Sequence, residues 1–548
     1  MKKSGHYDTI IIGAGSAGCV LAARLSEDRN HSVLLLESGP KDSSIILQMP
    51  AALGLPLTNN RFNWGYVSEP MAGLDGRTSD QHRGRVLGGS SSINGMVFVR
   101  GNPRDFDAWA DLGLPGWSYL NCLPYFRKME TFEGGSSAYR GGEGPLRVHR
   151  CRAESPLYHA FLAAGQDYGL ALNDDQNAGY QEGVNVAQAT VRDGVRESTA
   201  TAFLRPALGR TNLVVETSAH VVGLCISGNR VEGVTYKRNG IARTATASET
   251  VLSAGAYGSP QLLMLSGIGD PDELAAVGIK SRVRLPGVGR NLQDHVAVPL
   301  QYQTRREVSP VRQLSKLGRL GVGARWLLTH GGLGASNYFE VGAFLRGGSS
   351  HSYANIQHEF VPMIAGFNHG GPDIRHGFQY FTSIMRPQSR GRVSLRSADP
   401  HDPPRIELNL LGEAGDMAEM VEGLKTTREI VQQRSWDELR TAEYGIDDAE
   451  KSGPGMERWI RASAGTGYHP VGTCRMGNDD LAVTDADGLV HGINGLRVVD
   501  ASLMPRLVTG NTNAATIMIG EKLADSIKGR RLPPGDVDYE GARQSGHG

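Results

Sequence analysis

Cysteines are scarce in this sequence, and none stands in a metal-binding or disulfide pattern. Only five occur among 548 residues, and no two of them form a C-x-x-C pair. Zinc sites and disulfide frameworks need cysteines at characteristic spacings, so we expect neither, and we predict no bound metal. Scattered free thiols suit a reducing compartment. The five are Cys19, Cys122, Cys151, Cys225 and Cys474.

The chain also lacks an excess of charge of either sign. Lysine and arginine number 57, and aspartate and glutamate number 57, so the net charge is zero when histidine is neutral. Nucleic-acid-binding proteins usually carry a basic excess or a basic stripe. We therefore expect no nucleic-acid partner.

Long apolar runs are missing as well. No stretch approaches the roughly 18 apolar residues that a transmembrane helix needs. The first residues are polar and lead directly into a strand-like segment, which leaves no room for a signal peptide. These features predict a cytoplasmic protein whose membrane contact, if any, is peripheral.

A strand–turn–helix–strand pattern fills residues 7–37. Residues 10–12 form a β-branched run and residues 33–36 a second apolar run, each typical of a buried parallel strand. Between them, a G-x-G-x-x-G motif opens a segment of helical periodicity. Its glycines would permit a tight turn, the approach of a pyrophosphate to bare backbone, and close packing of helix on strand; they are Gly13, Gly15 and Gly18. Glu37 ends the second strand, where an acid accepts from the adenine ribose hydroxyls. The pattern predicts dinucleotide binding, with a merely glycine-rich turn as the alternative, and does not choose between NAD and FAD.

Two later segments extend this picture. Residues 88–92, GGSSS, form a turn rich in N–H and hydroxyl donors. Such a turn suits anionic oxygens or a flavin edge, and a plain polar loop is the alternative interpretation. Near the other end of the chain, residues 496–500 form an apolar strand ending in an acid, and residues 509–525 a polar turn that enters an apolar helix. A cofactor domain divided between the two chain ends favours a flavin over a loosely held nicotinamide.

The middle of the chain has a different character. At about 150 residues per domain, the length predicts at least two domains. Residues 300–460 contain no phosphate-type loop, and alternating runs at 355–361, 378–385 and 392–395 predict an antiparallel sheet, with a helix over 417–433 against it. We also expect helices over 103–130, 155–169 and 196–208, and strands over 212–216, 221–226 and 251–252. The tail after Gly529 is typical of disorder.

Taken together, these segments resemble the glucose–methanol–choline family of FAD oxidoreductases. The resemblance spans nearly the whole chain, through GAGSAG, GRVLGGSSSINGMVFVRG, GAYGSPQLLMLSGIG, YHPVGTCRMG, LRVVDASLMP and NTNAATIMIGEKLAD. QMPAAL and GGLGASNYFEVGAF are most similar to the choline dehydrogenase branch. The resemblance implies an α/β fold (α+β overall), with a Rossmann-like FAD-binding domain and a substrate domain whose antiparallel sheet is flanked by helices.

The resemblance also implies a domain order. The FAD-binding domain would comprise residues 1–155, 196–300 and 463–530, the last part carrying the catalytic histidine. The substrate domain would comprise an excursion over 156–195 and the segment 301–462. Residues 531–548 would form a disordered tail.

The family's cofactor residues can be transferred to matching positions of this chain. Those for the ADP half of FAD are Gly13, Gly15, Ser16, Ala17, Gly18, Glu37 and Ser38, with Val222 on the strand whose backbone meets the adenine. Those for the rest of FAD are Arg85, Gly88, Gly89, Ser92, Asn94, Gly95, Met96, Val97, Ala254, Asp500, Ala501, Asn511, Thr512 and Asn513. Members that attach FAD covalently use a histidine immediately before the equivalent of Asn94. Ile93 stands there in this chain, so we expect non-covalent FAD.

The same resemblance implies His469 and Asn513 as the catalytic pair. Alcohol oxidation requires loss of the hydroxyl proton and hydride transfer to flavin N5. A neutral imidazole can accept that proton at neutral pH, and an amide can hold the substrate oxygen. The implied activity is FAD-dependent dehydrogenation of a small primary alcohol, choline first, with a separate electron acceptor: a respiratory quinone, a carrier or O2.

The substrate residues that we expect follow from choline. Trp64 and Tyr66 match an aromatic segment that approaches the trimethylammonium group in choline-oxidising relatives, and Glu359 is the candidate carboxylate. Another hydroxy compound, such as 3-hydroxypropionate, would instead need an arginine, for which Arg386 is the candidate. An oxidase using O2, a non-oxidative lyase or decarboxylase, and a non-catalytic FAD-binding protein are further alternatives.

Overall fold

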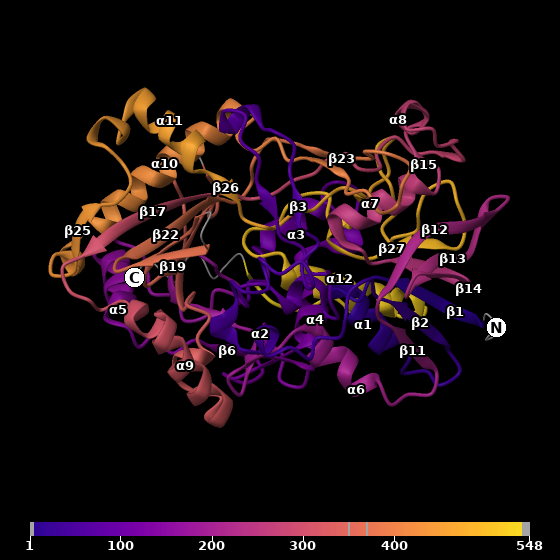
Figure 1. Ribbon diagram of the computed structural model, residues 1–548, viewed down its shortest axis with the longest axis horizontal. Helices are drawn as coiled ribbons and strands as arrows, with labels where there is room; N and C mark the ends of the chain where they lie inside the picture. The colour runs from indigo at the N-terminus through magenta and orange to yellow at the C-terminus, as the bar shows by residue number, and fades with distance from the viewer. Residues whose placement is uncertain (1–4, 349–350, 369–370, 540–548) are drawn as a thin grey trace.

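Two large sheets, one at each end of the molecule, organise the chain (Figure 1). The computed structural model describes residues 5–348, 351–368 and 371–539. Chain segments from both termini and from the middle contribute to the region between the sheets. This arrangement agrees with the predicted fold of a dinucleotide-binding domain combined with a substrate domain.

The first sheet has the order β11-β2-β1-β14-β13-β12, with β27 paired to β14. β1, β2, β11, β14 and β27 are parallel, whereas β12, β13 and β14 form an antiparallel meander. The strands are β1 (His6–Ile12), β2 (Val33–Leu36), β11 (Leu213–Glu216), β12 (Ala219–Ser227), β13 (Arg230–Arg238), β14 (Ile241–Leu252) and β27 (Leu496–Val498). The strands predicted around residues 10–12, 33–36, 212–216, 221–226, 251–252 and 496–500 are confirmed.

The parallel strands fix where a ligand can bind. Because β1, β2, β14 and β27 run in the same direction, their carboxyl ends meet at one edge of the sheet. Gly13 N donates to Leu36 O at 2.8 Å, Ser253 N to Ile12 O at 2.8 Å and Val499 N to Leu252 O at 2.8 Å, so the segments that follow the strands stay side by side. Ligands of open α/β sheets bind outside this edge.

The second sheet is antiparallel, as predicted, with the order β25-β17-β22-β19-β18-β7 and with β26 paired to β17. Its strands are β7 (Gly183–Val186), β17 (Val296–Thr304), β18 (Val341–Leu345), β19 (Ile356–Val361), β22 (Phe378–Ile384), β25 (Arg440–Glu443) and β26 (Gly465–Thr466). α5 (Pro156–Asp167) and α10 (Ala414–Val431) pack against it. The strand predicted at 392–395 is confirmed as β23 (Arg392–Ser394), but it pairs antiparallel with β24 (Arg405–Glu407) in a separate two-stranded sheet.

Several helices differ in detail from the sequence expectation. The helix expected over 103–130 is divided into α3 (Pro103–Ala110) and α4 (Tyr119–Met129), since Gly113 has φ +84° and Pro115 follows. The helix expected over 196–208 is a π-helical turn over 200–204 followed by α6 (Arg205–Ala207). α7 (Gly255–Leu265) follows β14, and α12 (Asn513–Ile527) runs between α1 (Ser16–Leu25) and α4 in the middle of the molecule (Figure 1).

The chain after Gly529 is not disordered where it is described. Leu532 N donates to Tyr125 Oη at 2.9 Å, and Gly535 N donates to Leu120 O at 2.8 Å. Tyr539 Oη donates to Asp107 Oδ2 at 2.6 Å. The predicted disorder is therefore wrong for residues 531–539, where apolar side chains pack on α4, and residues 540–548 lie outside the described residues. Within the described ranges, no helix is both long enough and apolar enough to cross a bilayer.

Candidate active site

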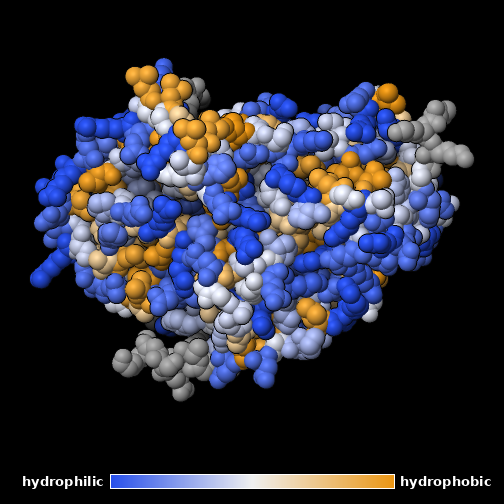
Figure 2. Space-filling model, turned by 90° about the horizontal axis from the view of Figure 1, so that it is seen from below, coloured by the Kyte–Doolittle hydropathy of each residue, from blue (hydrophilic) through white to orange (hydrophobic). Residues whose placement is uncertain are grey.

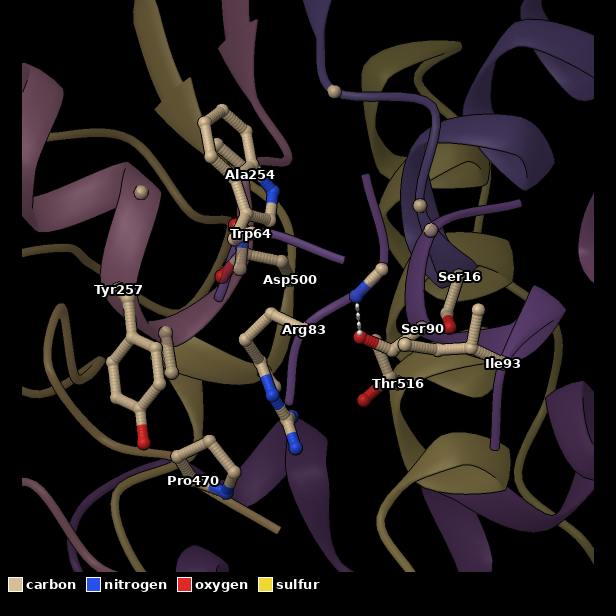
Figure 3. Close-up of a pocket in the computed structure, with 18 of the residues that line it drawn as sticks. Ser16, Trp64, Arg83, Ser90, Ile93, Ala254, Tyr257, Pro470, Asp500 and Thr516 are labelled. Carbon is tan, nitrogen blue, oxygen red and sulfur yellow. Dashed lines mark hydrogen bonds between the residues drawn. The ribbon is translucent and has the colours of Figure 1, made fainter. Parts of the chain in front are cut away.

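A cavity of about 390 Å³ lies at the carboxyl ends of the parallel strands. This volume falls within the usual range of ligand pockets. Figure 3 shows Trp64, Ala254 and Asp500 on one side and Ser16, Ser90, Ile93 and Thr516 on the other, with Arg83 between them. The segments after β1, β2, β14 and β27 form the wall on the side of the first sheet, and β19 contributes to the opposite end.

The glycine motif leaves one position open to this cavity. A Cβ on Gly13 would lie 2.5 Å from Ser253 O, and a Cβ on Gly18 would lie 1.9 Å from Gly13 O, so packing alone demands glycine at both. A Cβ on Gly15 would meet nothing closer than Ser253 O at 3.8 Å. Gly15 therefore presents bare backbone to the cavity, as a pyrophosphate requires.

Two helix N-termini converge at the same place. Ser16 begins α1 and Asn513 begins α12, and Ser16 Oγ donates to Asn513 Oδ1 at 2.7 Å. The first N–H groups of a helix have no partner within the helix, and the positive end of its dipole favours an anion. Two such ends beside Gly15 fit the diphosphate of a dinucleotide.

Glu37 and Ser38 line the cavity after β2, as predicted. The Glu37 carboxylate accepts from Ala14 N at 2.9 Å and from Gly39 N at 2.7 Å. Burial raises the pKa of Glu37 to about 7. Ser38 Oγ is hydrogen-bonded to His220 Nδ1 at 3.1 Å, which connects this end of the cavity to β12.

Trp64 and Tyr66 belong to this nucleotide end. Their rings stack with centroids 5.6 Å apart, and Trp64 also contacts His220, the partner of Ser38. The Arg85 guanidinium lies over the Trp64 ring at 5.1 Å. Both aromatics line the cavity, so their contact with a substrate cation stays a prediction, although a cation of the protein already lies over the Trp64 ring.

The turn over residues 88–92 packs directly on the glycine motif. Gly88 N donates to Ala14 O at 2.7 Å, and a Cβ on Gly89 would lie 2.7 Å from Gly15 Cα. Ser92 Oγ donates to Leu87 O and thus holds the turn together, whereas Ser90 lines the cavity. The turn is therefore part of the cofactor wall rather than a plain polar loop.

Most of the predicted cofactor residues line the cavity. They are Gly13, Gly15, Ser16, Ala17, Glu37, Ser38, Gly89, Asn94, Gly95, Met96, Val97, Ala254, Asp500, Ala501, Asn511, Thr512 and Asn513. Five others stand behind the wall: Gly18, Arg85, Gly88, Ser92 and Val222. The register of β12 and β13 skips Val222, and its neighbour Val221 lines the cavity instead.

The Asp500 carboxylate is fully engaged by the protein. Its oxygens accept from Gly255 N, Ser259 Oγ, Ser502 N and Ser502 Oγ, at distances of 2.6 to 2.8 Å. Asp500 therefore fixes the start of α7 against the turn after β27. Its position in the wall follows from these bonds.

His469 lies at the other end of the cavity, where the second sheet contributes. Its backbone N donates to Asp294 Oδ1 at 2.8 Å, and the preceding residue, Tyr468, has φ +62°. The Asn511 amide nitrogen is 3.2 Å from His469 Nε2 and 3.1 Å from Glu359 Oε1. The structure thus brings together His469, Asn511 and Glu359 from three distant parts of the chain.

His469 is hydrogen-bonded to Asn511 and not to Asn513, while the catalytic role of Asn513 stays a prediction. Both asparagines line the cavity, but Asn513 accepts from Ser16 at the N-terminus of α1. The two side chains stand two residues apart at the start of α12 and point to different partners. Only tertiary packing distinguishes them.

His295 is a site residue that sequence reasoning missed. Its Nδ1 lies 2.9 Å from His469 Nδ1, and its Nε2 lies 3.2 Å from Met385 O. A carbonyl only accepts, so His295 carries its proton on Nε2, and its Nδ1 accepts from His469 Nδ1–H. His469 Nε2 is then unprotonated, and in this structure its lone pair accepts from the Asn511 amide. The signal available in the sequence was the polar pair Asp294–His295 immediately before an apolar strand.

Burial sets the charge state of this end of the cavity. It lowers the pKa of His469 well below its ordinary value, and His295 and Arg83 act in the same direction. Burial also lowers the pKa of His295, to about 3. Both rings are consequently neutral at neutral pH, and His469 Nε2 can accept a proton. Burial raises the pKa of Glu359, while the bond from Asn511 opposes this effect.

The structure places two arginines differently from the sequence prediction. Arg386 does not line the cavity: it donates to Ala354 O and Thr509 Oγ1 and lies 3.7 Å over the Tyr353 ring. This corrects its predicted contact with a substrate carboxylate. Arg83, which was not expected, does line the cavity, and it donates to Tyr468 O at 2.6 Å.

Comparison with known proteins identifies the family. Models described as GMC oxidoreductase match residues 7–297 and 387–520. An oxygen-dependent choline dehydrogenase of Chromohalobacter salexigens is 44% identical over 546 residues, covering 98% of each chain. The chain belongs to the GMC oxidoreductase family. The predicted family, fold class and assignment as an FAD-dependent oxidoreductase are therefore confirmed.

Solved structures of this family share the whole fold. Pyridoxine 4-oxidase from Mesorbium loti is 33% identical with a TM-score of 0.87, covering 96% of this chain and 100% of its own. A formate oxidase variant of Aspergillus oryzae RIB40, studied for its FAD modification, is 27% identical with a TM-score of 0.90 and covers 96% of this chain and 99% of its own. The glycine motif, the paired helix N-termini and the Glu37 position give this GMC chain a cradle that fits FAD.

Proposed function

We propose that this protein oxidises a small primary alcohol to the aldehyde with FAD, and that choline is its leading substrate. The observation that carries the proposal is the hydrogen-bonded chain from Met385 O through His295 to His469, which leaves Nε2 of His469 unprotonated beside Asn511 and Glu359. The choline dehydrogenase relative that covers 98% of the chain supports the choice of alcohol.

His469 would act as the base. The substrate hydroxyl would donate to Nε2, and its proton would pass to that nitrogen as the alcohol carbon is oxidised. His295 would then accept from Nδ1–H throughout and hold the ring in place. Bound FAD would supply the two-electron acceptor for the hydride. The Asn511 amide, which donates toward Nε2, would hold the substrate oxygen in the same plane.

Glu359 supports a cationic substrate. Within the described residues it forms no ion pair, and burial raises its pKa. An ionised carboxylate that is largely shielded from water without a cation beside it is unfavourable, so a quaternary ammonium group there would compensate its charge. The fixed positive charge of choline cannot donate an N–H hydrogen bond, and a carboxylate recognises it by charge alone.

Arg83 supports the second candidate, a small hydroxy acid. It lines the cavity, and among the described residues it pairs with no carboxylate. Arginine binds a carboxylate bidentately, so an anionic substrate would turn its acid group toward Arg83 and its hydroxyl toward His469. Glu359 and Arg83 therefore predict opposite substrate charges.

Anaerobic reduction of the flavin by a panel of alcohols tests the proposal. We expect choline to reduce the flavin faster than its neutral isostere 3,3-dimethylbutan-1-ol and faster than 3-hydroxypropionate. Faster reduction by 3-hydroxypropionate would favour Arg83 over Glu359 as the recognition residue. If no alcohol reduces the flavin, the oxidative assignment itself fails. Repeating the assay with a dye and with O2 identifies the class of electron acceptor.

We further propose that FAD is bound without a covalent bond. Ile93 lines the cavity and packs in an apolar cluster with Leu47, Phe62 and Val86, so the position used for attachment in covalent relatives offers no nucleophile. Acid precipitation should release yellow flavin into the supernatant. Colour that stays in the pellet would show attachment through another side chain.

A further inference from the structure

α9 (Lys316–Thr329) carries a row of apolar side chains on its solvent face. Leu317 is 82% exposed, Leu320 70%, Leu327 59% and Leu328 86%. These positions recur at intervals of three and four residues, with the exposed Ala324 between them, so they lie on one face of the helix. We call this row the leucine stripe. Large leucines gathered in this way in water are unusual and mark an interaction surface.

The opposite face of α9 fixes the direction of the leucine stripe. Trp326 is 2% exposed, and its Nε1 donates to Gly194 O at 2.7 Å. A Cβ on Gly334 would lie 2.6 Å from Trp326 Cβ, so the segment after the helix packs tightly on this ring. The helix cannot roll to bury its leucines, and the stripe remains turned outward.

Two basic residues, Lys316 and Arg325, flank the leucine stripe, whereas Arg319 lies farther round the helix toward Trp326. Lys316, Arg319 and Arg325 are all exposed, and α9 contains no acidic residue. At 100° per residue, Lys316 falls on one margin of the stripe and Arg325 on the other. Residues 305–330 contain six basic residues and one acid, Glu307, although the whole chain is neutral.

An anionic lipid bilayer matches this surface better than a second copy of the chain. Symmetric pairing of two leucine stripes would bring the basic margins of the two helices together without an acid on either helix to neutralise them. A helix with an apolar face and cations at its edges is typical of one that lies in the headgroup layer, where the leucines enter the acyl region and the cations meet phosphates.

We propose that α9 anchors the protein peripherally to an anionic bilayer through its leucine stripe. The chain that follows α9 leads to Asn337, whose Nδ2 donates to Gly95 O at 2.8 Å, and to Phe339, which lines the cavity. Figure 2 views the molecule from below, the side on which α9 lies in Figure 1, and shows hydrophobic patches on that face. This inference does not depend on which alcohol is oxidised.

Vesicle flotation of the holoenzyme tests the proposal. We expect binding to vesicles of phosphatidylcholine mixed with phosphatidylglycerol, weaker binding to phosphatidylcholine alone, and loss of binding as salt rises. Each cation near an anionic surface contributes about a fivefold factor in affinity, so the double variant K316Q/R325Q should bind roughly 25-fold more weakly. The variant L320S/L328S should lose binding at least tenfold, since two leucine side chains would no longer be buried in the acyl region.

The matched control removes two exposed apolar residues elsewhere. Leu208 is 49% exposed and Ile241 is 61% exposed, both in the first-sheet half of the chain, so L208S/I241S should bind vesicles like the parent protein. An unchanged melting temperature in each variant shows that it is folded. Equal binding of L320S/L328S and L208S/I241S would overturn the proposal. The proposal would also be overturned if the parent protein did not bind anionic vesicles and instead formed a dimer that L320S/L328S abolishes. The leucine stripe would then bind a second copy of the chain.

Discussion

At the scale of single residues, the proposed function depends on one nitrogen, Nε2 of His469. Replacing His469 with alanine should leave FAD bound and slow flavin reduction by roughly 10²–10⁴-fold, the usual contribution of a positioned acid–base group. Asn511→Ala should cost less, because the base remains. Stopped-flow absorbance of the anaerobic enzyme measures both rates. Near-normal reduction by H469A would refute the proposed base.

His295 is predicted to act through His469 as a positioning residue. His295→Leu would leave His469 Nδ1–H buried without an acceptor, which costs about 1–3 kcal/mol and should slow flavin reduction roughly 5- to 150-fold. His295→Gln should restore much of the rate, because its amide can accept from His469 and donate to Met385 O.

The pH profile gives a second measure of this pair. Because burial holds the pKa of His469 well below 6.5, the neutral base persists as the pH falls, and the rate for the parent enzyme should stay level through pH 6.5. It should decline only at more acidic pH. A midpoint near 6.5 would show a solvated imidazole and contradict the buried relay. If His295→Leu slows flavin reduction and His295→Gln does not restore the rate, the loss would reflect packing only.

We expect Glu359 to determine whether the enzyme prefers a cationic or a neutral substrate. Glu359→Gln removes one member of the proposed buried charge pair and should raise the KM for choline at least about tenfold, since breaking such a pair costs several kcal/mol. The KM for 3,3-dimethylbutan-1-ol should not change. Trp64→Ala should leave the ratio of the two KM values unaltered, because Arg85 covers the ring. A change in that ratio would return Trp64 to the substrate site.

At the scale of elements, the β1–α1 turn separates a folding requirement from a binding requirement. Gly18→Ala would push a methyl group to 1.9 Å from Gly13 O, so the melting temperature of the protein should fall by several degrees. Gly15→Ala meets only Ser253 O at 3.8 Å and should fold normally.

The same Gly15 methyl group would stand where the pyrophosphate must approach, so G15A should lose FAD affinity. The ratio of flavin to protein absorbance and a thermal melt of each variant measure the two effects. A G15A protein with full flavin content would contradict the pyrophosphate position. The pyrophosphate position would also be contradicted if G18A and G15A changed flavin content and melting temperature in parallel.

At the scale of the whole molecule, the C-terminal segment after Gly529 returns to pack on α4. Truncation after Gly529 removes the bonds from Leu532 N to Tyr125 Oη and from Gly535 N to Leu120 O, together with the apolar contacts of Val537. The melting temperature should fall by a few degrees. Tyr125→Phe removes only the first of these bonds and serves as the milder control. An unchanged melting temperature after truncation would mean that the segment contributes nothing to stability.

The sequence by itself determined the local architecture of the cofactor domain. The strand at residues 10–12, the glycine motif and the acid at Glu37 follow one another within a single β–α–β unit, and their periodicity and spacing carry the whole signal. Ile93, Asn94 and the C-terminal helix after Asn513 could likewise be placed, because each belongs to a contiguous motif. The antiparallel nature of the second sheet also followed from alternation along its strands.

Only the tertiary structure decided which side chains meet. His295 and His469 are 174 residues apart, and Glu359 reaches Asn511 across 152 residues. Asn511 and Asn513 share one motif, yet the start of α12 turns the first toward His469 and the second toward Ser16. Trp64 and Tyr66 lie in a recognisable aromatic segment, but packing against Arg85 and His220 assigns them to the nucleotide end. Local sequence fixes periodicity and turn chemistry, whereas the direction of a side chain depends on partners that the chain brings together only when both sheets have formed.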